Sequence, residues 1–329
     1  MSVLQALRAL LLVYAVGAAV ILRQLLRRLR GGFRPPVLPW QPDRVALVTG
    51  GTEGIGLATA QQLAALGMRV VIAGNDKAKA QEVVSWIQAE TKNKRVHFLF
   101  CDLASLASVR KFARDFLSLG FPLHVLVNNA GVMMVPPSKT EDGFERHMGV
   151  NFLGHFLLTR LLLGVLRASG SPGQRSRVVT LGSATHYVGE LDIDTLRARP
   201  PHSASAAYAG SKLALVLFSR RLQRLLVARG DPVTSSVADP GVVDTALYRH
   251  AGWGIRAAKR LLGWALFKTP AEGAWTSVYA ASAPELEGRG GLYLTDEAPA
   301  EPLASTQDPE LQDRLWAVAE SVVGVARDD

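Results

Sequence analysis

From residue 43 onward, short runs of β-branched residues alternate with longer stretches of helical periodicity. The runs predict strands at residues 45–48, 70–73, 96–100, 125–127, 178–181, 234–238 and, less regularly, 291–294. Apolar residues at helical spacing predict helices at 55–66, 78–90, 106–119, 143–166 and 206–228. Strands that alternate with helices usually form a parallel sheet covered on both faces. We therefore expect one doubly wound α/β domain of about seven strands at 43–329.

The first 30 residues have a different pattern. Residues 3–22 are almost wholly apolar, and Arg23, Arg27 and Arg28 follow directly. Twenty helical residues rise about 30 Å, which is enough to cross a hydrocarbon core. Three interpretations compete: a cleaved signal peptide, which would make the protein secreted, a helix packed on the soluble domain, and an uncleaved membrane anchor at 1–30, either spanning or monotopic.

We favour the anchor for two reasons. No small-residue cleavage site follows the apolar stretch, and residues 9–22 are apolar on every helical face. The arginines downstream then predict a catalytic domain on the cytosolic side. Prolines at 35, 36, 39 and 42 predict a stiff, extended linker at 31–42.

The composition of the chain restricts the classes of partner and site that we expect. With 48% hydrophobic residues the chain can bury a core, and its net charge of +9 raises the question of nucleic acid. The basic residues of the globular part are scattered rather than clustered, so we expect no nucleic-acid partner. The single cysteine, Cys101, cannot form an internal disulfide, and the seven histidines lack metal-ligand spacing. We expect no metal site.

A glycine-rich loop follows the first predicted strand and precedes a predicted helix: Thr49, Gly50, Gly51, Thr52, Glu53, Gly54, Ile55 and Gly56. Glycines allow a sharp turn and let backbone amides approach a pyrophosphate, and the helix N-terminus adds partial positive charge. An ordinary strand–helix turn is the alternative. The position between strand and helix favours a dinucleotide site.

The end of the second predicted strand bears on the choice of cofactor. In dinucleotide-binding folds an acid here binds the ribose 2′-OH of NAD, whereas a nearby arginine accommodates the 2′-phosphate of NADP. Gly74 occupies the acidic position. Asn75 can bond a free hydroxyl without repelling a phosphate, Lys77 can neutralise one, and Glu53 opposes one. We predict that NAD and NADP both bind.

Tyr208 and Lys212 lie four residues apart on a predicted helix, so their side chains share one face. A phenol with a pKa near 10 is a poor base at neutral pH, and a nearby ammonium favours the phenolate. The pair can therefore serve proton transfer. Taken alone, a packed tyrosine beside a solvated lysine explains the same spacing.

These motifs occur in the order found in the short-chain dehydrogenase/reductase family, which the chain resembles over about 43–296. Asn151 to Thr159 is similar to the retinol-dehydrogenase-like branch, although Asn75 stands where that branch usually has arginine. The matching positions are the glycine loop, Asn128-Asn129-Ala130-Gly131, Asn151, Ser183, Tyr208, Lys212, Pro240, Gly241, Val242, Val243 and Thr245.

The resemblance implies a role for each position. Ser183 would hold the substrate oxygen, Tyr208 would exchange its proton, Lys212 would bond the nicotinamide ribose, and Asn151 would bind a water that joins Lys212 to solvent. Asp102 and Leu103 would contact the adenine, although Asp102 could instead cap the next helix. The remaining cofactor contacts would come from Asn129, Ala130, Gly131, Pro240, Gly241, Val243 and Thr245.

The resemblance further implies oxidation of a long-chain lipid alcohol, a polyprenol, to its aldehyde, and reduction of dolichal to dolichol. It implies a location at the endoplasmic reticulum membrane or the lipid droplet, and homo-oligomers are common in the family. The residues alone indicate only an apolar alcohol or carbonyl. A retinoid or steroid dehydrogenase and a non-catalytic nucleotide-binding regulator remain alternatives.

Two segments are expected to form the substrate side. Residues 184–207, with Tyr187, Leu191 and Ile193, are long for a connection and typical of a binding loop. Residues 251–268 predict an amphipathic helix with Arg256, Lys259 and Arg260 on one face, and Trp253 and Trp264 suit a membrane interface. This helix is either a lid resting on the bilayer or an ordinary helix packed on the core.

Overall fold

The computed structural model describes residues 3–193, 196, 203–250, 260–261 and 263–325. Its sheet has the strand order β3-β2-β1-β4-β5-β6-β7-β8, in which β7 and β8 alone pair antiparallel. The strands are β1 (Val45–Thr49), β2 (Arg69–Gly74), β3 (Val96–Phe100), β4 (Val125–Asn128), β5 (Ser176–Leu181), β6 (Val233–Asp239), β7 (Tyr293–Thr295) and β8 (Ala298–Ala300). The expected doubly wound fold is confirmed.

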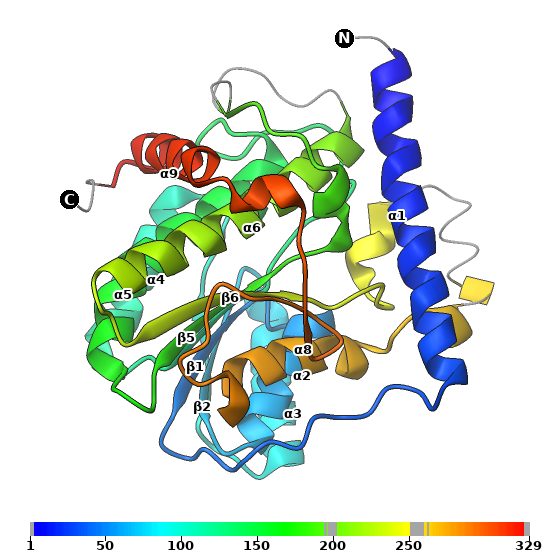
Figure 1. Ribbon diagram of the computed structural model, residues 1–329. Helices are drawn as coiled ribbons and strands as arrows, with labels where there is room; N and C mark the ends of the chain where they lie inside the picture. Colours follow the sequence, from blue (N-terminus) through cyan, green and yellow to red (C-terminus); the bar gives the residue numbers. More distant parts are fainter. Residues whose placement is uncertain (1–2, 194–195, 197–202, 251–259, 262, 326–329) are drawn as a thin grey trace.

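Helices cover both faces of the sheet (Figure 1). One layer consists of α2 (Gly54–Ala65), α3 (Lys77–Thr91) and α8 (Pro270–Ser282). The other consists of α4 (Leu106–Ser118), α5 (Gly154–Ser169) and α6 (Ala204–Ala228), with α9 (Pro309–Val323) packed outside α6. Short turns of helix occur at η1 (Met148–Leu153, a π-helix), η2 (Ala184–Val188), η4 (Ala246–His250), η5 (Pro284–Leu286) and η6 (Ala304–Gln307).

The alternation of side chains along β1 divides the interior into two cores. Ala46 and Val48 pack in the core under α2 and α8, and Leu47 packs in the core under α5 and α6. All three are fully buried, as expected for a central strand with both faces covered. The β-branched runs that predict the strands follow from this double burial.

Three features differ from the expected pattern. β8 is an additional edge strand of three residues with Pro299 at its centre, too short and too irregular for the pattern to show. α8 has few large apolar residues, and its clearest signal is a capping box formed by Thr269 and Glu272. The expected helix at 143–166 divides into the π-helix η1 and α5.

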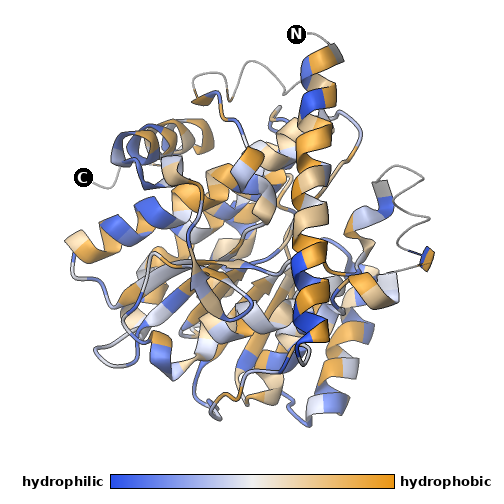
Figure 2. Cartoon of the chain, turned by 45° about the vertical axis from the view of Figure 1, so that its right-hand side comes forward, coloured by the Kyte–Doolittle hydropathy of each residue, from blue (hydrophilic) through white to orange (hydrophobic). Residues whose placement is uncertain are grey.

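The N-terminal helix α1 (Val3–Leu29) runs along one side of the domain (Figure 1). It is one of two described segments long and apolar enough to cross a membrane; the other, Met148–Ser169, is 78% buried in the domain, whereas α1 is 11% buried. Figure 2 shows α1 in front of the domain, apolar over most of its length and with hydrophilic positions towards both ends. The helix thus has the exposure expected of an anchor and also contacts the domain.

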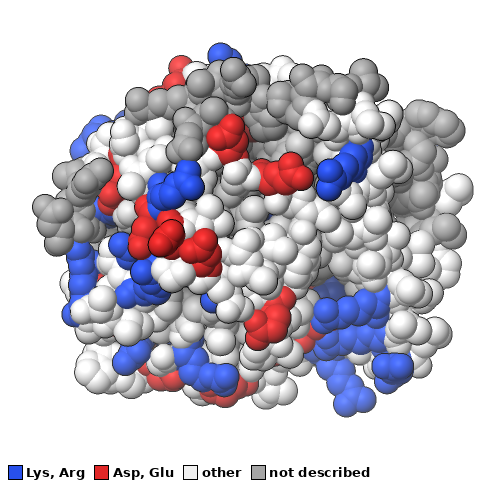
Figure 3. All heavy atoms as spheres, turned by 45° about the horizontal axis from the view of Figure 1, so that its top comes forward, with Lys and Arg blue, Asp and Glu red and all other residues white. Residues whose placement is uncertain are grey.

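Its arginines are engaged with acidic residues of the domain. Arg23 and Arg27 pair with Asp296 at 2.8 and 3.1 Å, and Arg28 pairs with Glu272 at 3.2 Å. Residues 32–40 have no regular secondary structure, and Phe33 receives the guanidinium of Arg27 over its ring at 5.1 Å. Figure 3 shows Lys and Arg gathered at the lower right, and acidic and basic residues side by side towards the left of that face.

Candidate active site

The glycine loop joins β1 to α2 in a conformation that requires glycine. Gly50 and Gly54 have positive φ values of 64° and 57°. A Cβ on Gly56 would lie 2.2 Å from the carbonyl oxygen of Gly50. Glu53 is the N-cap of α2, but its side chain makes no capping bond. The first backbone amides of the helix can therefore donate hydrogen bonds to an anion. This cradle fits a pyrophosphate.

A chain of buried hydrogen bonds holds the loop to the next strand. Thr49 Oγ1 accepts from the amides of Asn129 and Ala130 at 2.9 and 3.0 Å. His155 Nδ1 donates to the carbonyl oxygen of Asn151, so Nε2 carries the lone pair and accepts from Thr49 Oγ1, both at 2.8 Å. Burial lowers the pKa of His155 to about 4. The imidazole is therefore a neutral positioning group.

The expected reactive residues meet at the carboxyl end of β5. Tyr208, from α6, places its phenol beside the hydroxyl groups of Ser183 and Thr185, both of which act to lower its pKa. Thr185 Oγ1 also donates to Ser183 Oγ at 3.0 Å. Lys212 Nζ lies 5.8 Å from the Tyr208 ring centroid and donates to the carbonyl oxygen of Leu181 at 2.9 Å. The structure thus brings Ser183, Tyr208 and Lys212 together.

The electrostatics of this cluster differ from the sequence-based expectation. Burial raises the pKa of Tyr208 to about 12, while the bonds to Ser183 and Thr185 act against that rise. Burial likewise lowers the pKa of Lys212 to about 8, and the nearby Asp239 acts in the opposite direction. Desolvation outweighs the expected influence of Lys212 on the phenol. Two hydroxyl groups, rather than the ammonium, favour the phenolate here.

Asn151 lies in the π-helix η1 and is fully buried. Its Oδ1 accepts from the amide of Val132 at 2.8 Å, and its Nδ2 donates to Val132 O at 3.1 Å and Ser211 Oγ at 2.9 Å. The side chain therefore holds the segment that follows β4. The bridging water expected at Asn151 stays a prediction.

A cavity of about 830 Å³ runs between the glycine loop and the reactive cluster. Three of the expected site residues lie outside its lining: Asn151, Lys77 and Gly51, whose Cβ position is occupied by Ile72. The expected residues that line the cavity are Gly50, Thr52, Glu53, Gly54, Ile55, Gly56, Asn75, Asp102, Leu103, Asn129, Ala130, Gly131, Ser183, Tyr208, Lys212, Pro240, Gly241, Val243 and Thr245.

A different lysine stands at the end of the cavity beside Asn75. Lys77 places its ammonium over the Phe100 ring, 4.7 Å from the centroid, and Lys79 lines the cavity instead. Lys79 Nζ pairs with Glu53 at 3.1 Å, and Arg249 pairs with the same carboxylate. The charge of Glu53 is thus compensated by two cations.

Sequence reasoning missed several residues of the lining. Thr185 lies in the connection that follows β5 and belongs to no recognised motif. Its position two residues after Ser183 is the signal that could have identified it. Asp239, the last residue of β6, accepts from the hydroxyl of Tyr293 at 2.6 Å and the amide of Gly241 at 2.9 Å. Apolar side chains complete the wall: Met133, Met134, Leu247, Leu266, Phe267 and one face of α1. No local pattern brings α1 to this place.

The structure bears differently on the two segments that were expected to form the substrate side. In the described part of 184–207, Ala184 and Thr185 line the cavity, whereas Tyr187, Leu191 and Ile193 do not. In the expected helix at 251–268, residues 251–259 and 262, with Trp253, Arg256 and Lys259, lie outside the described residues. Residues 260–261 and 263–266 are helical, and Trp264 is 80% exposed.

A short chain dehydrogenase family model matches residues 44–252. The chain is 69% identical to a polyprenol dehydrogenase of Mus musculus over 329 residues, covering 100% of this chain and 98% of that one. It is 39% identical to retinol dehydrogenase 14 of Homo sapiens, covering 92% and 91% of the two chains.

Among solved structures, the Pseudomonas aeruginosa RhlG/NADP active-site complex matches with a TM-score of 0.62 at 28% identity. The match covers 78% of this chain and 97% of that one. The family model spans more than half of the chain, and its match includes the glycine loop, Ser183, Tyr208 and Lys212. The chain belongs to the short-chain dehydrogenase family.

Proposed function

We propose that this oxidoreductase converts a polyprenol to its aldehyde with NAD or NADP, and reduces dolichal to dolichol by the same chemistry. The observation that carries the proposal is the cluster of Ser183, Thr185, Tyr208 and Lys212 in a cavity that combines a phosphate cradle with apolar walls. The likeness to polyprenol dehydrogenases over nearly the whole chain supports the same substrate class.

Each residue of the cluster has its own role in the proposed reaction. Ser183 Oγ holds the substrate oxygen, and Tyr208 Oη takes its proton during oxidation or returns it during reduction. Lys212, anchored on Leu181, bonds the ribose. The nicotinamide, when bound, accepts or supplies the hydride. The glycine loop and the open N-terminus of α2 hold the phosphates of either cofactor.

The direct test is turnover by the purified protein. Polyprenol, retinol and a steroid alcohol are each incubated with NAD and with NADP, and the aldehyde or ketone is quantified. We expect turnover of polyprenol. Turnover of retinol alone would support the alternative favoured by the retinol dehydrogenase relatives, and turnover of none would support a non-catalytic nucleotide-binding role.

Tyr208→Phe tests the proton-transfer role. Removal of the hydroxyl should lower kcat by about 10²–10⁴-fold, the usual contribution of a positioned acid or base, while Kd for the nucleotide stays close to that of the wild type. Tyr187→Phe is the matched control, because Tyr187 lies in η2, is 41% exposed and is outside the cavity lining. Equal kcat for the two variants would contradict the role.

Cofactor use is tested by titration. Asn75 lines the cavity, and its amide can bond a hydroxyl without repelling a phosphate; Lys79 rather than Lys77 is the lysine in the cavity wall. We expect the Kd values for NAD and NADP to agree within a factor of about 100, because no acidic side chain occupies the selective position. A larger difference in either direction would refute dual use.

We propose further that α1 attaches the protein to the cytosolic side of the endoplasmic reticulum membrane or to lipid droplets. Its exposed leucines and its contact with the domain favour attachment in one leaflet. Fractionation of cells and protease protection of the domain test this, and a lumenal domain would contradict it. Homo-oligomerisation stays a prediction, measured by light scattering of detergent-solubilised protein.

A further inference from the structure

One face of α1 contributes directly to the wall of the catalytic cavity. Val13, Gly17, Val20 and Ile21 line the same cavity as Ser183 and Tyr208. Tyr14, Val16 and Ala18 line it as well. Together these residues form one broad stripe on a single side of the helix. At a rise of 1.5 Å per residue, the stripe from Val13 to Ile21 is about 12 Å long. An apolar chain attached to an alcohol at Ser183 would meet this stripe.

The opposite face of the helix is exposed and made of larger side chains. Leu11 and Leu22 are 67% and 57% exposed, and Leu4, Leu7, Leu26 and Leu29 are exposed as well. The cavity stripe instead contains Gly17, where an added Cβ would meet no atom within 4 Å. The two faces of α1 therefore differ in both bulk and surroundings.

Gln24 fastens the helix beside the cavity. This polar residue is 2% exposed. Its Nε2 donates to the carbonyl oxygens of Val242 and Leu266 at 3.0 and 3.3 Å, and its Oε1 accepts from the amide of Val242 at 2.7 Å. Val242 directly follows Pro240 and Gly241, which line the cavity. The bonds fix α1 to the loop that borders the reaction site.

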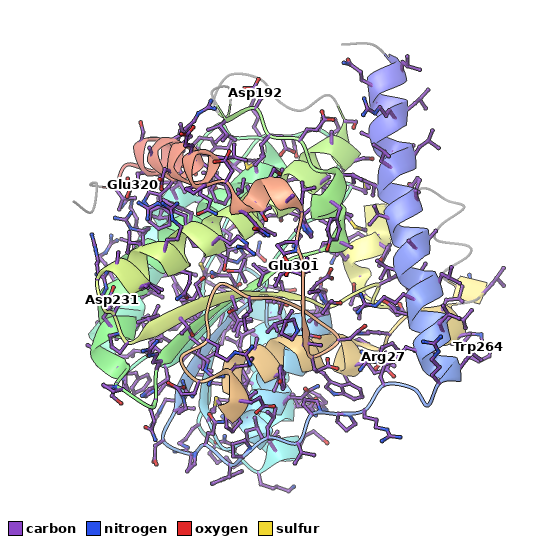
Figure 4. The ribbon with its side chains drawn as sticks, in the orientation of Figure 1. Arg27, Asp192, Asp231, Trp264, Glu301 and Glu320 are labelled. Carbon is purple, nitrogen blue, oxygen red and sulfur yellow. The ribbon has the colours of Figure 1, made fainter. Side chains whose placement is uncertain are left out.

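Ion pairs strengthen the same attachment. Arg23 and Arg27 reach Asp296, which also pairs with the buried Lys268 at 2.7 Å. Arg28 donates to the carbonyl oxygen of Phe267, a residue of the cavity wall, at 2.7 Å. Figure 4 shows Arg27 and Trp264 near the same end of α1. The C-terminal part of α1 is thus built into the domain.

We propose that α1 is a wall of the substrate site, along which the apolar chain of the alcohol lies while its hydroxyl rests on Ser183 and Tyr208. This inference rests on the proposed function in one respect, namely that the substrate is an alcohol with a long apolar chain. Gly17 provides space for the chain at the middle of the stripe. If α1 served only as an anchor, a bulky side chain added to either of its faces would have the same effect on substrate binding.

A pair of leucine substitutions in full-length protein tests this. Gly17→Leu adds bulk to the cavity stripe, and Ala19→Leu adds the same side chain to the exposed face, where Ala19 lies outside the lining. Both variants make α1 more apolar, so they change membrane affinity alike. Gly17→Ala controls for the loss of a helical glycine, which by itself favours the helix.

Steady-state kinetics are measured with prenyl alcohols of increasing length and with retinol. For the longest alcohol that the wild type turns over, Gly17→Leu should raise KM by about tenfold or more, because one misplaced apolar group costs that much in a fitted pocket. The shortest alcohol should keep its kcat/KM. Ala19→Leu and Gly17→Ala should match the wild type throughout.

The outcomes separate the two proposals. Equal kinetics for Gly17→Leu and Ala19→Leu, with polyprenol turned over by the wild type, would overturn the wall and leave the proposed function intact. A wild type inactive on polyprenol but active on retinol, with the contrast between the two variants preserved, would overturn the proposed substrate and leave the wall intact. A wild type inactive on every alcohol would overturn both.

Discussion

Lys212 is held at the reaction site at a cost to the folded state. Its ammonium donates to the carbonyl oxygen of Leu181, and burial lowers its pKa from 10.5 to about 8. A buried group with a shifted pKa destabilises the fold by about 1.4 kcal/mol per pKa unit. Such a cost is common where function requires a charge in a poorly solvated place.

Lys212→Met should therefore stabilise the protein while it abolishes turnover. The unfolded chain keeps the lysine proton up to about pH 10.5, and the folded chain loses it near pH 8. The cost of burial is full below about pH 8 and vanishes as the pH rises to 10.5. After the loss of the bond to Leu181, we expect a net gain of about 2 kcal/mol in the free energy of unfolding at pH 7.

Chemical denaturation at several pH values between 7 and 10.5 measures the effect. The advantage of Lys212→Met should be constant up to about pH 8 and then shrink steadily up to pH 10.5. Lys94→Met, on the exposed Lys94, serves as the control and should show no such change. An advantage that is absent at pH 7, or constant up to pH 10.5, would argue against a costly buried ammonium.

Sequence patterns predict some residues of the site and not others. Ser183, Tyr208 and Lys212 stand in ordered motifs, and the structure places them together. Thr185 and Lys79 were missed because their roles depend on how a loop and a helix turn, not on a motif. The expected effect of Lys212 on Tyr208 failed for a related reason: desolvation is set by the whole fold and cannot be read from a spacing of four residues.

At the scale of elements, the glycine loop packs tightly against the start of α2 and shapes a cradle that fits a pyrophosphate. A Cβ on Gly56 would lie 2.2 Å from Gly50 O and 2.3 Å from Asn129 Nδ2. Neither atom can move freely, because Asn129 Nδ2 also donates to Thr49 O at 2.7 Å. The glycine is therefore required by the close approach of loop, helix and strand.

Gly56→Ala should destabilise the protein by about 1–3 kcal/mol, the usual cost of forcing atoms into a packed interior, and should weaken nucleotide binding. Gly164→Ala is the control: Gly164 lies in α5 with no atom within 4 Å of its Cβ position, so alanine should stabilise that helix by up to about 1 kcal/mol. Thermal unfolding and nucleotide titration measure both. Equal effects of the two substitutions would contradict the close packing.

Whether a segment forms a helix or a strand was predictable where burial imposes a clear period on its apolar residues. The seven expected strands are all present because sheet burial selects β-branched runs. The division of 143–166 into η1 and α5 was not predictable, because one extra residue in a helical turn leaves the apolar pattern nearly unchanged. The antiparallel β8 and the alanine-rich α8 lack the large apolar residues on which periodicity depends.

At the scale of the whole molecule, Asp296 is the centre of the contact between α1 and the domain. Burial by itself would raise the pKa of Asp296, but Lys268, Arg27 and Arg23 together hold it below its ordinary value of 3.8. The stabilisation that this depressed pKa represents is present above pH 3.8 and is lost as the pH falls through the folded value. Lys268 is only 1% exposed and depends on this carboxylate.

Asp296→Asn should lower the free energy of unfolding by about 3–5 kcal/mol, because it leaves a buried ammonium without its partner, and should release α1 to limited proteolysis near 31–42. Asp115→Asn, which removes an exposed i,i+4 pair with Lys111, should change stability by less than about 0.5 kcal/mol. Thermal unfolding and the rate of cleavage measure both. An intact linker in Asp296→Asn would contradict the anchoring role of this residue.

The sequence by itself determined the doubly wound class, the glycine loop, the Ser183–Tyr208–Lys212 set and the apolar character of the N-terminal helix. Each of these follows from periodicity or from spacing within one segment. The tertiary structure decided which lysine faces the cavity, how burial shifts the titratable groups, and that α1 lies beside the reaction site. These features arise from contacts between residues distant in the chain, such as Gln24 with Val242 and Arg27 with Asp296, which no local pattern encodes.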